Sequence, residues 1–329
     1  MDSISQETLM LLMLSSIKGV GDKKLLSFLS IPNFKEFSFD EIFFKFLKGN
    51  KSEISTVKPT AMLYAEEQIA EAKKREHKII SIFDYCYPSQ LKFSNDAPAI
   101  LFVAGNINIL NKKSVAVIGT RDPTEHGKII CERLTKSLID NNWVVVSGLA
   151  KGIDSISHDT CVKHNGQTIA VMAQGLEKIY PAENRELAKK ILDTGGALVS
   201  EYPYNSHTGR SNFVKRDATQ AGLSSSVFLV QTGVNGGSLH ASRAILKYGR
   251  PLVVVGQSKT DENTRPENAE GSFILLKGEY KDAVNILGFK FDENLLIKMK
   301  DKDDLLMVNS VLNNFTHTNY KQSNDFKLI

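Results

Sequence analysis

The sequence predicts an α/β protein in which a doubly wound, mostly parallel sheet follows a small helical domain. From about residue 78, short apolar runs alternate with amphipathic segments of helical length, the pattern of parallel strands joined by helices. Several runs are β-branched and apolar at successive positions, as in strands buried on both faces. We expect a helical domain over 1–75, a sheet domain over 76–288 and a short helical and polar C-terminal tail over 289–329.

The individual elements follow from the same patterns. Leu9, Leu12 and Met13 recur at helical spacing, and residues 61–76 lack Gly and Pro and are rich in strong helix formers. Strands are expected over 99–103, 114–118, 143–147, 168–172, 197–200, 227–230 and 251–255. Helices are expected over 124–140, 183–193, 238–248 and 292–300, a surface loop over 257–270, and a polar, mobile end over 316–326.

The composition of the 329-residue chain is that of a globular protein, with 42% hydrophobic and 24% charged residues. The net charge of +4 allows a nucleic-acid partner without requiring one, because local patches matter more than the total. Three cysteines without a CxxC pair argue against a disulfide framework or a cysteine-based zinc site, and favour a reducing compartment. The apolar stretch 9–14 is too short to span a bilayer, so we expect a cytoplasmic protein.

The stretch "SVAVIGTRDPTEHG", residues 114–127, predicts a buried strand, a glycine turn and a helix N-terminus. Gly119 lets a backbone approach a ligand closely, and the N–H groups that open the following helix favour an anion. The glycine alone does not distinguish a ligand-binding turn from a βα turn without a ligand. Arg121 favours the ligand, because an arginine at the carboxyl end of a strand can bind a phosphate through two hydrogen bonds.

A second turn, "SGLAKGIDSISHD" at 147–159, also follows a buried strand. Ligands of open α/β sheets bind beyond the carboxyl ends of the strands, so the two turns predict one shared site. Asp154 and His158 stand four residues apart and share a helix face. No nucleophile accompanies them, so we expect a structural hydrogen bond between the two rather than a catalytic pair.

A basic cluster lies in "GRSNFVKRDATQAGLS", residues 209–224, where Arg210, Lys215 and Arg216 surround Phe213. Cations that track phosphates beside a ring that stacks on a base are typical of single-strand binding. The same residues would also suit a phenylalanine in the core with solvated charges around it. The residues alone leave both interpretations open.

A third turn that could bind an anion is predicted in "TGVNGGSLHASR", residues 232–243, where Gly236, Gly237 and Ser238 precede a helix. A hydrolase of nucleotide N-glycosidic bonds would carry a glutamate on this helix as its general acid or base, and this sequence has none there.

The segment "SIKGVGDKK", residues 16–24, has the form of a helix-hairpin-helix. In that motif the Gly-x-Gly backbone N–H groups hold a DNA phosphate without reading the bases. An ordinary turn between two helices is the alternative interpretation.

Taken together and in order, these motifs resemble DNA-processing protein A, the DprA/Smf family. The matching stretches include "YPSQLKFSNDAPAILFVAGNINILNKKSVAVIGTR", "SGLAKGIDSISH", "QTIAVMAQGLEKIYPAENRELAKKI", "GALVSEYP", "AGLS", "GGSLHASRAILKYGRPLVVV" and "EGSFILLKGEYKDAVNIL". The resemblance covers about residues 75–288. The helix-hairpin-helix-like segment stands where many members carry a small N-terminal helical domain.

The resemblance implies a Rossmann-like domain that binds single-stranded DNA without enzymatic chemistry, and with no metal or cofactor. It also implies a homodimer that protects incoming strands and helps to load the RecA recombinase in natural transformation. The DNA pocket would be formed by Gly119, Arg121, Ser147, Gly148, Phe213, Lys215, Arg216, Gly236, Gly237 and Ser238. A secondary contact would be made by Gly19, Gly21, Lys23 and Lys24.

The chain departs from the family pattern at three places. Where the family usually has Arg-Asn-Arg, this sequence has Arg216, Asp217 and Ala218, so a basic residue is lost and an acidic one gained. The usual acidic ending of the next strand is replaced by "VQT" at 230–232, and the residues after 288 do not accommodate the frequent winged-helix domain. These departures motivate a second hypothesis, a nucleotide-sensing or regulatory paralogue, with a role in defence among its options. An N-glycosidic hydrolase is the third and least favoured hypothesis.

Overall fold

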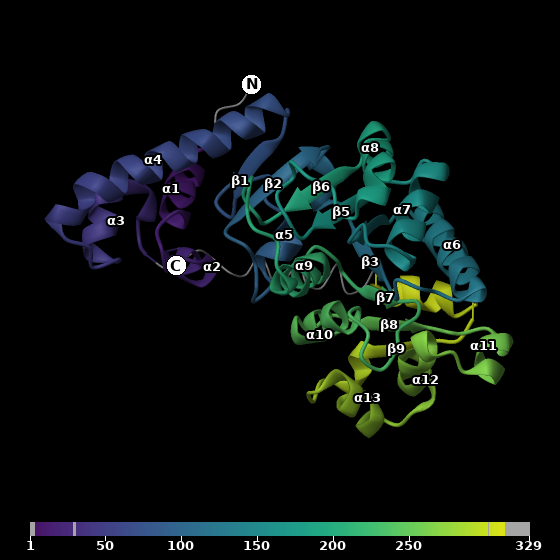
Figure 1. Cartoon of the computed structure of the whole chain (residues 1–329). Coiled ribbons are helices and arrows are strands. Elements are labelled where there is room, and N and C mark those ends of the chain that lie inside the picture. Colours follow the sequence, from purple (N-terminus) through teal and green to yellow (C-terminus); the bar gives the residue numbers. More distant parts are fainter. Residues whose placement is uncertain (1–3, 29–30, 302, 313–329) are drawn as a thin grey trace.

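The computed structural model describes residues 4–28, 31–301 and 303–312. A single sheet with the strand order β1-β2-β6-β5-β4-β3-β7-β8-β9 forms its centre (Figure 1). Its strands are β1 (Lys78–Ser81), β2 (Ile100–Gly105), β3 (Ser114–Ile118), β4 (Val144–Ser147), β5 (Thr168–Met172), β6 (Ala197–Ser200), β7 (Val227–Leu229), β8 (Leu252–Val255) and β9 (Leu296–Met299). Neighbours from β6 to β9 pair in parallel, and β2 pairs antiparallel with both β1 and β6. The predicted fold class is confirmed.

The central strands are buried along their whole length, which explains their continuous apolar sequence. On β3, Val115 and Val117 belong to the core on one face of the sheet, while Ala116 and Ile118 belong to the core on the other. This alternation follows from the two-residue period of a strand.

Helices cover both faces of the sheet (Figure 1). The crossovers from β3 to β6 run through α6 (Glu125–Asp140), α7 (Ile153–Lys163) and α8 (Arg185–Asp193), which lie along one face. Chain order reverses at β3, and α9 (Arg210–Gly222) and α10 (Leu239–Lys247) cover the opposite face. This part also contains α5 (Ser89–Lys92), α11 (Lys259–Thr264), α12 (Glu270–Lys277) and α13 (Tyr280–Leu287).

The helical domain packs beside the β1 end of the sheet (Figure 1). Its helices are α1 (Gln6–Ser15), α2 (Asp22–Ser27), α3 (Phe39–Lys45) and α4 (Lys51–Lys74). Thr8 on α1 donates its hydroxyl to Asp84 at 2.5 Å, and Gln68 on α4 accepts the backbone N–H of Tyr204 at 2.8 Å. Both contacts join this domain to residues that follow strands of the sheet.

The structure corrects several predicted elements. The helix expected over 292–300 is wrong, because β9 occupies 296–299 and extends the sheet beside β8. The segment 257–270, expected as a loop, contains α11, whose first turn is capped by Ser258. The basic cluster around Phe213 lies on helix α9, an element that the sequence patterns did not indicate.

The chain after residue 288 contributes to the sheet domain. A helix over 304–312 buries Leu305 and Val308 in the core beside α6, and the indole N–H of Trp143 donates to Asn309 at 3.2 Å. The division into three units stays a prediction, and the polar end expected over 316–326 lies outside the described residues. Among the described helices, none combines the length and the hydropathy needed to cross a bilayer.

Candidate nucleic-acid interface

A pocket opens where β3, β4 and β5 end, and α9 forms one of its walls. It is lined by Arg121, Gly148, Ala150, Lys151, Ala173, Gln174, Tyr180, Pro181, Phe213 and Arg216. The hollow, with the part open to solvent, holds about 440 Å³. Chain order reverses between β3 and β7, and such a switch point is where open α/β sheets bind ligands. The two turns predicted to share a site therefore do lie together.

Arg216 forms part of the inner wall and is only 5% exposed. One terminal nitrogen of its guanidinium donates to the carbonyl of Gly148 and, at 3.1 Å, to the carbonyl of Val171. Its Nε lies 3.0 Å from the Asp217 carboxylate. Arg216 therefore ties α9 to the ends of β4 and β5. A Cβ at Gly148 would lie 1.6 Å from the guanidinium, so only glycine leaves room for this contact.

A buried carboxylate, Asp154, and a partly buried one, Asp217, lie close to Arg216. Asp154 accepts the backbone N–H groups of Gly148 and Ala150 at 3.2 and 3.4 Å, which holds the second turn closed. Burial raises the pKa of Asp154, and the charge of Arg216 opposes the rise. Burial also raises the pKa of Asp217 to about 6, with Arg216 opposing the shift and Asp154 adding to it. The guanidinium thus compensates two acidic groups, and little of its charge remains for a ligand.

His158 does not pair with Asp154, so the predicted hydrogen bond between them is wrong. The Nδ1 atom of His158 lies 2.8 Å from the hydroxyl of Thr168 instead. Burial lowers the pKa of His158 to about 3, so the ring is neutral at physiological pH and has a structural role.

Cations and aromatic rings gather at the mouth of the pocket. Arg121 is exposed there, close enough to Asp217 for its charge to lower the pKa of that carboxyl. Lys151 pairs with Glu183 at 2.7 Å, and both side chains are mostly exposed, so the pair contributes little and the lysine can turn to a ligand. The rings of Tyr180 and Phe213 meet edge to face, with centroids 5.8 Å apart.

Four predicted residues line the pocket: Arg121, Gly148, Phe213 and Arg216. Gly119 instead makes room for helix α7, since a Cβ there would lie 2.5 Å from Ile153. Ser147 is fully buried, and its hydroxyl donates to the carbonyl of Val117 at 2.7 Å.

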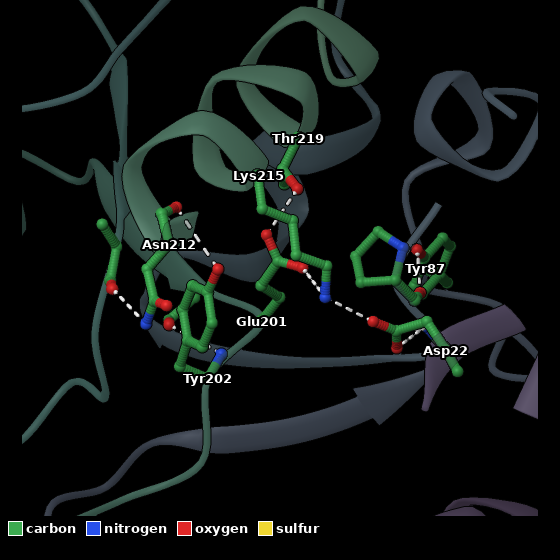
Figure 2. A network of polar contacts seen from close by, with 11 residues as sticks. Asp22, Tyr87, Glu201, Tyr202, Asn212, Lys215 and Thr219 are labelled. Atoms are coloured by element: carbon green, nitrogen blue, oxygen red, sulfur yellow. Dashed lines mark hydrogen bonds and ion pairs between the residues drawn. The ribbon is translucent and has the colours of Figure 1, made fainter. Parts of the chain in front are cut away.

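Lys215 points away from the pocket and pairs with Glu201 at 2.6 Å and with Asp22 at 2.5 Å. Figure 2 shows this network, which joins α9 to the end of β6 and to α2. The lysine predicted as a phosphate ligand is therefore held in an ion pair.

The third predicted turn lies after β7 and is not part of the pocket lining. The hydroxyl of Ser238 donates to Thr232 at 2.8 Å, and Gly236 packs tightly against that same threonine. A Cβ at Gly237 would meet open space. The turn closes on itself rather than facing the cations of the first two turns.

The glycines of the helical domain form the turn between α1 and α2. Gly19 has a φ of +87°, which favours glycine, and Gly21 precedes the first residue of α2. Gly19 and Lys24 line a second, open hollow of about 1060 Å³, and Lys23 is exposed. This hollow is lined only by residues of the helical domain.

Sequence reasoning missed Lys151, Gln174 and Tyr180, which line the pocket with the predicted residues. Lys151 stands inside the second glycine turn, so its place in "SGLAKGID" could have indicated it. Tyr180 lies in the connection between β5 and α8, and no local pattern brings it to Phe213.

Comparison with known proteins gives the family. The sequence profile of the family described as DNA recombination-mediator protein A matches residues 78–273, more than half of the chain. The chain belongs to this family. The DprA of Streptococcus pneumoniae is 32% identical over 220 residues, which cover 65% of this chain and 77% of that protein. The DprA of Bacillus subtilis is 37% identical over 194 residues, and protein Smf of Escherichia coli is 34% identical over 187.

The matched part spans 65% of the B. subtilis protein and 50% of the E. coli protein, and it covers 59% and 57% of this chain. A crystal structure of the S. pneumoniae DNA processing protein A aligns with 88% of this chain and all of that chain, at a TM-score of 0.62 and 26% identity. A structure of the Helicobacter pylori protein, reported for its single-stranded DNA binding mode, aligns with 66% of this chain and 98% of that chain, at a TM-score of 0.54 and 26% identity. The DprA family thus comprises recombination mediators that share this fold.

Proposed function

We propose that the chain binds single-stranded DNA in the pocket beyond β3, β4 and β5, without a chemical step. The proposal rests on one observation: two exposed cations, Arg121 and Lys151, line the same pocket as the aromatic pair of Tyr180 and Phe213. Cations that hold a backbone beside rings that stack on bases are what sequence-tolerant single-strand binding requires.

Different residues of the pocket would contact the phosphates and the bases of the strand. Arg121 and Lys151 stand at the mouth, where they can hold consecutive phosphates, and Phe213 and Tyr180 offer ring faces to a base. Arg216 supports the wall, since one terminal nitrogen of its guanidinium is bonded to the carbonyls of Gly148 and Val171 and its Nε lies beside Asp217. Helix α10 carries no carboxylate that could serve as a general acid, which supports binding without catalysis.

The family gives the proposal its biological setting. A protein of the DNA recombination-mediator family that holds single strands would protect them and present them to a RecA-type recombinase. We extend the proposal to that role, with the protein acting as a homodimer in DNA recombination or uptake. Filament formation by a RecA-type recombinase on strands first coated with a single-strand-binding protein, with and without this chain, tests the role directly.

A titration of fluorescently labelled oligothymidylate, followed by anisotropy, tests the binding. Arg121→Ala should weaken binding about tenfold or more, because a hydrogen bond to a charged group contributes about 1.5–3 kcal/mol. Arg133→Ala is the matched control, because Arg133 is an exposed arginine on α6 and no part of the pocket lining. Equal affinities of the Arg121 and Arg133 variants, or no binding by the unmodified protein at low salt, would refute the proposal.

A free nucleotide is the second candidate ligand, and the charge of Asp217 favours it. The carboxylate of Asp217 lies beside Arg216 in the pocket wall and disfavours a dense array of phosphates. Competition of mononucleotides and cyclic nucleotides against the labelled oligonucleotide separates the two. Displacement by a nucleotide at a concentration far below that needed by an unlabelled oligonucleotide would favour the nucleotide.

A further inference from the structure

The ion-pair network around Lys215 connects three distant parts of the chain (Figure 2). Lys215 lies on α9, Glu201 directly follows β6, and Asp22 is the first residue of α2 in the helical domain. The ammonium lies 2.6 Å from Glu201 and 2.5 Å from Asp22. The carboxylate of Glu201 is 1% exposed and that of Asp22 29% exposed.

Both carboxylates are fixed by other contacts. Asp22 accepts the backbone N–H of Ala99, just before β2, at 3.2 Å through its second oxygen. Glu201 accepts the hydroxyl of Thr219, one helical turn after Lys215, at 3.0 Å. Burial raises the pKa of Glu201, and the lysine charge opposes the rise. If Lys215 turned to a phosphate, Glu201 would be left buried without its counter-charge, which is costly.

The position of Lys215 on α9 separates it from the pocket. At about 100° per residue, Lys215 lies about 200° around the helix from Phe213 and about 100° from Arg216. Arg216 bonds to the ends of β4 and β5, and Lys215 bonds to the end of β6 and to α2. Helix α9 is thus held by charged contacts on two different sides, and it carries Phe213 to the pocket mouth.

We propose that Asp22 and Lys215 are positioning residues through which the helical domain holds α9, and with it Phe213, in the geometry that binds a single strand. The inference rests on the proposed function of the pocket. It gives the helical domain a part in binding without any contact to the strand. It also replaces the direct phosphate contact that the sequence predicts for Lys215.

The network can be tested without detaching the helical domain. Thr8 bonds to Asp84, and Gln68 bonds to the backbone of Tyr204, so these contacts remain when Asp22 is changed. In Asp22→Asn the side-chain oxygen can still accept the N–H of Ala99. Lys215 loses one of its two carboxylate partners and keeps Glu201.

Asp40→Asn is the matched control. It removes the same charge from the same domain, and Asp40 pairs with Lys58 on α4 at 2.8 Å, remote from α9. Asp22→Asn should weaken oligothymidylate binding by about two- to thirtyfold, the range in which residues outside a site modulate it. Asp40→Asn should leave affinity unchanged. The double variant of Asp22→Asn with Lys215→Met should bind no more weakly than Lys215→Met alone, because Lys215→Met already removes the ion pair that Asp22→Asn breaks.

The two roles of Lys215 predict opposite results. For a lysine that bound phosphate directly, Asp22→Asn would remove one of the two carboxylates that compete for its charge, so affinity would rise. Lys215→Met would then lower the slope of log affinity against log salt by about 0.7. A positioning lysine leaves that slope unchanged in every variant. Unchanged or higher affinity in Asp22→Asn, or a reduced slope in Lys215→Met, would overturn the inference.

Hydrogen exchange separates this inference from the proposed function. In Asp22→Asn, amides of α9 should exchange several-fold faster than in Asp40→Asn, whether or not the protein binds an oligonucleotide. If the unmodified protein binds no strand, the proposed function fails and the exchange of α9 still reports on the contact. Suppose instead that the unmodified protein binds the strand and that Arg121→Ala weakens this binding. If the amides of α9 then exchange equally fast in Asp22→Asn and Asp40→Asn, the inference alone fails.

Discussion

Replacing Arg216 by methionine should destabilise the protein more than replacing an exposed arginine of the same helix. The guanidinium is 5% exposed, donates to the carbonyls of Gly148 and Val171, and pairs with Asp217 at 3.0 Å. Methionine has nearly the length of the stem but no donor, so the carbonyls lose their partner. Asp154 and Asp217 lose the positive charge that opposes their raised pKa values.

The magnitude follows from these losses. Removing one partner of a buried ion pair costs about 3–5 kcal/mol, and that figure includes most of the unmade hydrogen bonds. At about 2 °C per kcal/mol for a domain of this size, the melting temperature should fall by about 6–10 °C. In the variant the two carboxylates take up protons more readily. Their ionised forms are the costly ones, so the loss should be greater at pH 8 than at pH 5.

Thermal unfolding followed by circular dichroism at both pH values measures this effect. Arg210→Met is the control, because Arg210 is exposed in the first turn of α9. A melting temperature for Arg216→Met within about 2 °C of the control, equivalent to roughly 1 kcal/mol, would refute the structural role. A loss that is larger at pH 5 than at pH 8 would refute the account of the two carboxylates.

Three further predictions concern the pocket. Phe213→Ala and Tyr180→Ala should each weaken oligothymidylate binding, by about 1–3 kcal/mol if the ring stacks on a base, with an unchanged salt dependence; unchanged affinity in both would exclude stacking. Asp217 has a pKa of about 6, and a bound phosphate disfavours its ionised form, so the affinity for oligothymidylate should rise as pH falls through about 6. Asp217→Asn should bind more tightly than the unmodified protein at pH 8, and its affinity should not change near pH 6. A change near pH 6 that persists in the variant belongs to another group. Gly148→Ala should displace Arg216 and lower the melting temperature, because overpacking of this kind costs about 1–3 kcal/mol; a melting temperature equal to that of the unmodified protein would contradict the contact.

The sheet could be predicted from the sequence because its central strands carry their own signal. The run of β3 is apolar at every position after Ser114, and its observed bounds are those expected. Strand β9 could not be predicted in the same way. Its residues "LIKM" have no strong strand preference, and pairing with β8 decides their structure.

The site was predictable only in part, for a similar reason. Arg121 could be placed at the pocket because it stands in the turn after a strand whose carboxyl end faces the ligand side. The sequence shows that Arg216 and Lys215 are cations, but it does not show which groups their side chains bind. The carbonyl acceptors of Arg216 lie in the turn after β4 and on β5, and Asp22 lies 193 positions from Lys215. Such pairings depend on the tertiary structure, and no local pattern encodes them.

The salt dependence of oligothymidylate binding tests the central claim most directly. If Arg121 holds a phosphate, Arg121→Ala should reduce the slope of log affinity against log salt concentration by about 0.7, the share of one contact on a single strand. Arg133→Ala should leave the slope as it is in the unmodified protein. A lower affinity with an unchanged slope in Arg121→Ala, or equal slope changes in both variants, would contradict a phosphate contact at this pocket.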